Sequence, residues 1–186
     1  IDLEQQVGSV NIDYIGATEE VVANMIANGK KNIAFVSASL SNPINGQHRL
    51  KGYKNALVNA NIAFDEALVF ECEPTLQNGE LLAEQLLEAG VDAAYVAGDE
   101  LAIGLLNAII NAGVSVPEAF EVTASDNSRI SEMARPKLTS IMLPLYDIGA
   151  VAMRLLTKIM NKEEIDEKSI ILPYKIVNRG TTLPKK

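Results

Sequence analysis

The chain has 186 residues, a formal net charge of −8 and an ordinary globular composition of 48% hydrophobic and 22% charged residues. This length can bury a sizeable core in one domain or slightly more. No apolar run approaches the roughly 18–20 residues that cross a bilayer. The acidic balance disfavours direct binding of nucleic acid, because phosphate contacts require an excess of Lys and Arg.

A single cysteine, Cys72, excludes an internal disulfide and fits a reducing compartment. We find no secretory signal peptide, so we expect a cytoplasmic protein. The sequence begins at Ile1 and not at Met, which indicates a fragment of a longer protein.

The first half of the chain alternates predicted strands and helices. Short apolar runs bounded by polar residues indicate buried strands, and apolar residues at helical spacing indicate helices. Gly29 is expected to end the first helix, and a polar loop with Pro43 and Gly46 precedes the second. In order, the sequence predicts a strand at 7–14, a helix at 18–28, a strand at 32–37, a helix at 47–60 and a strand at 67–71.

The second half continues the same alternation. Asp99 is expected to cap a helix, residues 126–128 form a turn, and Pro173 implies a strand edge or a bend. In order, the sequence predicts a helix at 76–88, a strand at 92–97, a helix at 100–112, strands at 120–125 and 138–143, a helix at 145–160 and closing strands within 169–177.

This alternation predicts an α/β fold with a doubly wound parallel sheet. Ligands of such sheets bind at the carboxyl ends of the strands. The rule brings three segments to one rim: the loop after Val36, the Gly98–Asp99 turn and the Asp126–Asn127 turn.

The predicted helix 145–160 has two distinct faces. Its apolar residues have the spacing of a buried stripe, while the other face carries Arg154 and Lys158 one turn apart, beside Asp147 and the small Ala150. Two such cations can bind an anionic group, although a solvated helix face would carry the same charges. The predicted buried stripe consists of Ile148, Val151, Ala152, Leu155, Leu156 and Ile159.

Three residues at the predicted rim can contact a ligand. Arg49 can hold hydroxyls or an anion, or be an ordinary exposed helix arginine. Asp126 can accept hydrogen bonds from ligand hydroxyls, or merely close a turn. Asp99 can cap its helix or contact the ligand.

Catalytic motifs are missing from the sequence. His48 is the sole histidine, and with one cysteine it makes neither a metal constellation nor a catalytic triad. No paired carboxylates at a recognisable spacing and no phosphate-binding glycine loop occur. We therefore expect a protein that is not an enzyme and uses no cofactor or metal.

Several segments, in matching order, resemble the effector-binding core of the LacI/GalR family of bacterial transcription regulators. The resemblance covers essentially the whole chain, and the run YDIGAVAMRLLTKIMNKE (146–163) is most similar to the members that mediate carbon catabolite control. The family-wide segments are GKKNIAFVS (29–37), RLKGYKNAL (49–57), GDELAIGLLNAI (98–109) and SDNSRISEMARPKLTSI (125–141).

The resemblance implies two lobes with a periplasmic-binding-protein-like fold, preceded by a DNA-binding headpiece that this chain lacks. Residues 14–143 would form the complete C-terminal lobe. Residues 1–13 and 144–186 would supply the closing strands and the late-returning part of a partial N-terminal lobe.

The resemblance also assigns an effector cleft to Arg49, Gly98, Asp99 and Asp126, with a sugar phosphate as a possible effector. Position 98 is often Asn in members that bind sugars or purines. The glycine found here removes an amide that orients the ligand, which fits regulators whose main signal is a protein.

In the catabolite-control members, that protein is the phosphocarrier HPr phosphorylated on a serine. The resemblance further implies a homodimer that binds operator DNA through the headpiece. The docking residues for the phosphorylated carrier would be Tyr146, Asp147, Ala150, Val151, Arg154 and Lys158, with Arg179 on the last strand as a further cation.

Two other functional classes share α/β folds. A sugar-binding protein of a transport system would carry a signal peptide and an aromatic-lined cleft, whereas this chain has 5% aromatic residues and no tryptophan. A LacI-family regulator that responds to a small sugar effector is a further alternative. An α/β enzyme lacks support from any motif, although fold alone does not exclude it.

Overall fold

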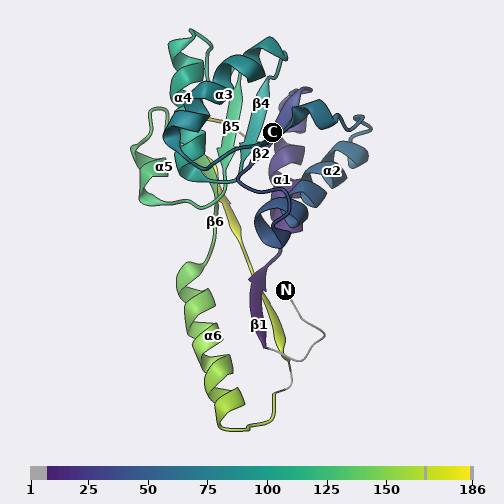
Figure 1. The fold of residues 1–186 in the computed structure, drawn as a ribbon, viewed down its shortest axis with the longest axis vertical. Coiled ribbons are helices and arrows are strands. Elements are labelled where there is room, and N and C mark those ends of the chain that lie inside the picture. Colours follow the sequence, from purple (N-terminus) through teal and green to yellow (C-terminus); the bar gives the residue numbers. More distant parts are fainter. Residues whose placement is uncertain (1–7, 166, 185–186) are drawn as a thin grey trace. The chain divides into compact units, whose positions relative to one another are not determined.

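The computed structural model describes residues 8–165 and 167–184 and divides them into two compact units (Figure 1). The smaller unit contains the described residues of 1–13 and 143–175, and the larger contains 14–142 and those from 176 onward. Within the described part, no helix is long and apolar enough to cross a membrane.

The larger unit is built on a six-stranded sheet with the order β3-β2-β4-β5-β6-β8. The pairs β2–β3, β2–β4, β4–β5 and β5–β6 are parallel. The predicted α/β fold is therefore confirmed, and chain order and strand order differ as in a doubly wound sheet. The strands are β2 (Ile33–Ser37), β3 (Val69–Glu71), β4 (Ala93–Val96), β5 (Glu121–Ala124), β6 (Thr139–Met142) and β8 (Lys175–Val177).

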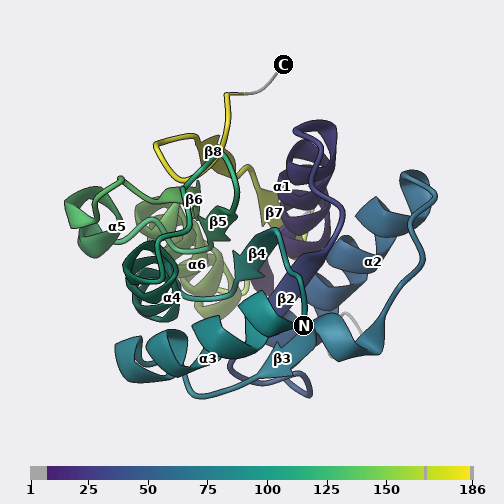
Figure 2. The same cartoon turned by 90° about the horizontal axis from the view of Figure 1, so that it is seen from above.

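Helices cover both faces of this sheet (Figure 2). The helices α1 (Tyr14–Ala27) and α2 (Arg49–Asn59) lie on one face, where Phe35 stacks on Tyr95 and packs against the tilted ring of Tyr53. The helices α3 (Leu76–Glu88) and α4 (Asp99–Asn111) lie on the other face, where they enclose the main apolar core. Successive side chains of a strand point to opposite faces of the sheet, so the neighbours of Phe35 and Tyr95 in sequence point into this core. These buried residues are Ala34, Val36, Ala94 and Val96.

Three shorter elements complete the larger unit. A π-helical turn at Pro43–His48 replaces the predicted polar loop, a 3₁₀ turn at Glu66–Leu68 precedes β3, and α5 (Arg129–Met133) follows β5. Helix α1 begins at Tyr14, earlier than the predicted start at residue 18.

The smaller unit contains a two-stranded parallel sheet and one long helix. Strand β1 (Ser9–Ile12) pairs in register with β7 (Ser169–Leu172), and α6 (Leu145–Met160) packs on β1. Leu155 is the residue of α6 that is buried, whereas Leu156 and Ile159 are 47% and 43% exposed. The prediction of a fully buried stripe was wrong for the described chain, because this small sheet covers little more than Leu155 and its neighbours.

The division into units differs from the prediction at its C-terminal boundary. Residues 176–184 belong with the larger unit and not with the smaller one. Thr181 explains this placement: its hydroxyl donates to the carbonyl of Val122 over 2.7 Å and accepts from the backbone N–H of Thr139 over 2.8 Å.

Candidate functional site

The rim at the carboxyl ends of β2, β4 and β5 gathers the predicted ligand-contacting residues of the larger unit. These three strands are neighbours and run parallel, so the segments that follow them emerge at the same edge. Arg49 comes from the start of α2, Asp99 from the first turn of α4, and Asp126 from the turn after β5.

Arg49 is buried, with 4% of its surface exposed, so the alternative of an ordinary exposed arginine was wrong. Its guanidinium donates a 2.6 Å hydrogen bond to Ser125 Oγ and lies 5.3 Å from the ring centroid of Tyr14. A guanidinium held in this way is oriented by an aromatic face and a hydroxyl, and its planar fork suits bidentate recognition of an anion or a pair of hydroxyls.

Asp126 is exposed at the rim turn, although the protein shields part of its carboxyl from solvent. Burial raises the pKa of its carboxyl, while the nearby Arg49 lowers it. Burial likewise raises the pKa of the Tyr14 hydroxyl, and Arg49 again opposes the shift. Arg49 therefore lowers the pKa of both groups, and its guanidinium lies over the ring of Tyr14.

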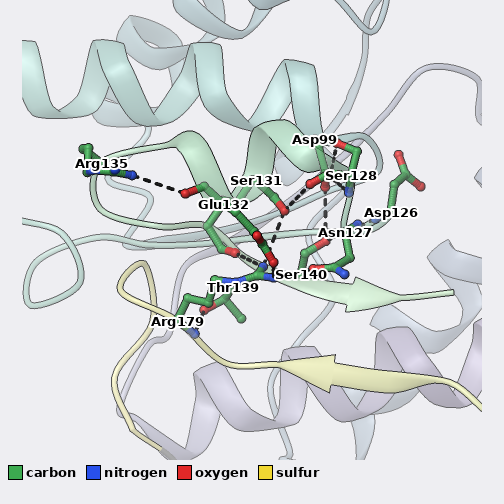
Figure 3. Close-up of polar contacts among 11 residues, drawn as sticks. Asp99, Asp126, Asn127, Ser128, Ser131, Glu132, Arg135, Thr139, Ser140 and Arg179 are labelled. Carbon is green, nitrogen blue, oxygen red and sulfur yellow. Dashed lines mark hydrogen bonds and ion pairs between the residues drawn. The ribbon is translucent and has the colours of Figure 1, made fainter.

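Asp99 does not cap its helix, contrary to the prediction, because the N-cap position of α4 is Gly98. Asp99 is buried within the first helical turn, and its carboxylate accepts from the backbone N–H and the hydroxyl of Ser128, over 2.6 and 2.7 Å (Figure 3). Its other oxygen accepts from Ser140 Oγ over 3.1 Å. Asp99 therefore connects α4 to the β5–α5 turn and to β6.

Gly98 has a φ of 144°, in the region that residues with side chains rarely adopt. A Cβ added there would come no nearer than 3.9 Å to Pro74. The backbone conformation, and not a lack of space, accounts for the glycine at this position.

The charged face of α6 is open to solvent in the smaller unit. Tyr146 is 87% exposed, and Asp147, Ala150, Arg154 and Lys158 are exposed as well. Among the described residues, the side chains of Arg154 and Lys158 have no hydrogen-bonding or ion-pairing partner.

A cavity of about 290 Å³ lies beside these two cations. Val151 and Leu155 provide its apolar wall, and Arg154 and Lys158 line it together with Glu167. The helix thus presents two cations next to a shallow apolar surface, a combination that suits a partner carrying an anionic group.

Arg179 lies beyond the last strand and not on it as predicted, because β8 ends at Val177. It belongs to the larger unit, and its guanidinium donates to the carbonyl of Leu138 and to Asn127 Oδ1 (Figure 3). The structure therefore brings Arg179 together with the rim turn.

Sequence reasoning missed three members of the rim: Tyr14, Ser125 and Ser140. Ser125 directly precedes Asp126 at the end of a predicted strand, so its place at the rim could have been inferred. Tyr14 was expected at the end of a strand and not at the start of a helix. No local pattern in the sequence indicates that Ser140 accepts hydrogen bonds from the backbone of the Asp126–Asn127 turn. Among the described residues, no group of three or more His, Cys, Asp or Glu side chains could hold a metal ion.

The sequence of residues 22–182 matches a known family, the periplasmic binding protein-like domain. The chain belongs to this family. Catabolite control protein A of Streptococcus mutans is 52% identical over 182 residues, which are 98% of this chain and 54% of that protein. The chain thus spans about half the length of its curated relatives.

Solved structures of this family agree with the fold. The transcription regulator CcpA of Lactococcus lactis has a TM-score of 0.91 and 45% identity, over 98% of this chain and 67% of that one. A LacI-family sugar-binding regulator from Escherichia coli, solved with phosphate, has a TM-score of 0.84 and 29% identity, over 94% and 63%. The resemblance to LacI/GalR regulators is confirmed, and these homologues are transcription regulators, not enzymes.

Proposed function

We propose that this chain is the effector-sensing and dimerising core of a LacI-family regulator that mediates carbon catabolite control by binding seryl-phosphorylated HPr. The observation that carries the proposal is the exposed pair Arg154 and Lys158 on α6, which has no partner among the described residues and lies beside an apolar-walled cavity. The similarity to catabolite control protein A supports the same assignment.

The chemistry of the pair fits a phosphoserine. A phosphoserine near neutral pH carries a charge of about −1.5 to −2, and an arginine can bind it through two parallel hydrogen bonds. Lys158, one turn further along α6, adds a compact positive charge. Ala150 lets a partner helix approach closely, and the exposed ring of Tyr146 offers an aromatic anchor.

Binding of the phosphorylated partner would act by population shift. A partner that binds one arrangement of the protein better than another stabilises that arrangement, and linkage requires the same coupling in return. In this proposal the favoured arrangement orders headpieces outside this chain for operator DNA.

Self-association is part of the same proposal. An apolar groove of about 580 Å³ lies between the start of α3, α4 and α5, and Ile130 and Met133 line it with 39% and 71% of their surface exposed. The groove also carries both Glu100 and Arg135, so two copies related by a two-fold axis could pair opposite charges. These features support a homodimer.

A small effector at the rim is the second candidate. Arg49 and Asp126 place a cation, a carboxyl and neighbouring hydroxyls at the ligand-binding edge of the sheet, with Gly98 and Asp99 beside them. This set suits a sugar phosphate, whose hydroxyls and anionic group need both donors and acceptors. A regulator with a small sugar effector and a transport protein for sugars would both rely on this rim and not on α6.

The test is calorimetric titration of the full-length protein with HPr in its seryl-phosphorylated and unphosphorylated forms. We expect tight binding of the phosphorylated form alone. Arg154→Ala should weaken it by about 2–3 kcal/mol, or roughly 30- to 150-fold, the value of a hydrogen bond between charged groups. Arg129→Ala is the matched control, because Arg129 is also exposed and without a described partner.

Two results would contradict the proposal. Equal affinity for both forms of HPr would show that the phosphate is not recognised. Binding of neither form, with a measurable affinity for a sugar phosphate, would favour the regulator with a small effector and move attention to Arg49 and Asp126.

A further inference from the structure

The guanidinium of Arg179 is engaged within the larger unit. Its Nη2 donates to Asn127 Oδ1 over 2.6 Å, and its Nη1 donates to the carbonyl oxygen of Leu138 over 2.7 Å (Figure 3). Nη2 also lies 3.4 Å from Glu132 Oε1, and the side chain is 10% exposed. Because protein acceptors already engage both Nη atoms, Arg179 is not a free cation available to an external anion.

The residue that Arg179 holds, Asn127, directly follows Asp126 in the rim turn. Asn127 has a φ of 52°, the left-handed conformation that costs free energy for residues other than glycine. A second contact also restrains the turn, since the backbone N–H groups of Asp126 and Asn127 donate to Ser140 Oγ over 3.1 and 2.9 Å. Ser140 in turn donates to Asp99.

Arg179 also lies close in sequence to a crossing between the units. The chain enters the larger unit after Lys175, and Arg179 anchors this incoming segment with its own backbone N–H, which donates to Thr139 Oγ1 over 2.8 Å. One residue therefore connects the incoming segment, β6 and the rim turn.

We propose that Arg179 is a positioning residue for the ligand rim, which fixes the turn that presents Asp126. The proposal rests on the rim being a ligand site, and it assigns Arg179 to that rim in place of the phosphoprotein-binding role implied by the family resemblance. Without Arg179, the side chain of Asn127 loses its shortest hydrogen bond. The turn then samples other conformations, and the Asp126 carboxyl is less well placed for a ligand.

The experiment compares Arg179→Met with Arg129→Met in the full-length protein. Arg129 lies near the same turn and is exposed, and its side chain makes no hydrogen bond or ion pair among the described residues, so both variants remove one guanidinium. A second variant, Asn127→Gly, removes the same hydrogen bond from the other side while tolerating the positive φ. Circular dichroism establishes that each variant is folded.

The first measurement is hydrogen–deuterium exchange of short peptides covering residues 125–128. We expect exchange at Asp126 and Asn127 to become at least tenfold faster in Arg179→Met and Asn127→Gly, and to stay at the wild-type rate in Arg129→Met. Wild-type exchange in Arg179→Met and Asn127→Gly would overturn the proposal, whether or not the rim binds a ligand.

The second measurement is affinity, with glucose 6-phosphate as the probe for the rim and seryl-phosphorylated HPr as the probe for α6. We expect Arg179→Met to weaken glucose 6-phosphate binding about tenfold and to leave HPr affinity within twofold. Loss of HPr binding with normal exchange in the turn would overturn the proposal and restore the phosphoprotein-binding role. If the wild type binds no glucose 6-phosphate, the proposed sugar-phosphate effector fails, and the exchange result alone decides the positioning role.

Discussion

The backbone of Gly104 in α4 lies directly against the carbonyl oxygen of Leu76 at the start of α3. A Cβ added to Gly104 would overlap that oxygen, and one added to Gly79 would overlap the carbonyl oxygen of Leu101. The two helices therefore approach each other through a pair of glycines, one from each helix, and this approach closes the apolar core beneath them.

Gly104→Ala should lower the free energy of unfolding by about 2–4 kcal/mol, because the helices must separate to admit the methyl group. The matched control is Gly149→Ala in α6, where an added Cβ meets no atom within 4 Å. Alanine should stabilise that helix by up to about 1 kcal/mol through its higher helix propensity. Urea unfolding measures both changes, and equal effects of the two substitutions would contradict the proposed contact.

Tyr53→Phe should lower the free energy of unfolding by about 1–3 kcal/mol, since it leaves the backbone oxygen of Ile33 without its donor in a buried site. The Tyr53 hydroxyl donates to that oxygen over 2.8 Å, and burial raises the pKa of Tyr53 to about 12. Tyr146→Phe is the control, because Tyr146 is 87% exposed, and its stability should stay within about 0.5 kcal/mol of the wild type. Thermal and urea unfolding at neutral pH are the measurements.

Glu121→Gln should change how stability depends on pH. Glu121 Oε1 accepts from Leu183 N and Asn28 Nδ2, both over 2.9 Å, but Oε2 is buried without a partner among the described residues. Burial raises the pKa of this carboxyl above its ordinary value of 4.5, so the folded state binds the proton more tightly than the unfolded state. The free energy of unfolding therefore falls as pH rises from about 4.5 through the folded pKa.

Glutamine at position 121 keeps the oxygen acceptor and cannot ionise. The variant should therefore gain stability relative to the wild type as pH rises through this window. Urea unfolding at several pH values gives the difference, and Glu84→Gln, on an exposed position of α3, should follow the wild-type curve. A difference between Glu121→Gln and the wild type that stays constant with pH would contradict the prediction.

Arg49→Met should raise the pKa of Asp126 further, because the guanidinium stabilises the ionised carboxyl and its removal takes away the largest of the effects that oppose burial. The pKa of Tyr14 should rise for the same reason. Carbon-13 NMR of the Asp126 carboxyl during a pH titration measures the first shift, with Arg129→Met as the control for a lost surface charge. An unchanged or lowered Asp126 pKa would show that Arg49 does not act on this carboxyl.

Local sequence signals predicted the larger unit well where they were complete. Helix α3 occupies the predicted residues 76–88, because Thr75 supplies a side-chain cap that accepts from Asn78 N and Gly90 takes the left-handed conformation beyond its end. The order of strands and helices followed from the alternation of apolar runs. The shared rim followed from it as well, since strands of one parallel sheet end at one edge.

The errors arose where partners distant in sequence decide the outcome. The position of Arg49 in the sequence does not indicate that its guanidinium donates a hydrogen bond to Ser125. The sequence around Asp99 is typical of a helix cap, yet its carboxylate accepts hydrogen bonds from the hydroxyls of Ser128 and Ser140 instead. The apolar stripe of α6 marks a surface able to pack, but periodicity does not say how much of a partner surface its own unit supplies.

The chain passes between the two units after Asp13, after Met142 and after Lys175. Neither unit is therefore an uninterrupted stretch of sequence, and cutting any one crossing leaves the units joined by two covalent connections. A protease that nicks a single crossing should yield fragments that stay together under native conditions and separate in denaturant. The same threading means that a single continuous deletion within the chain cannot remove either unit whole without cutting into the other.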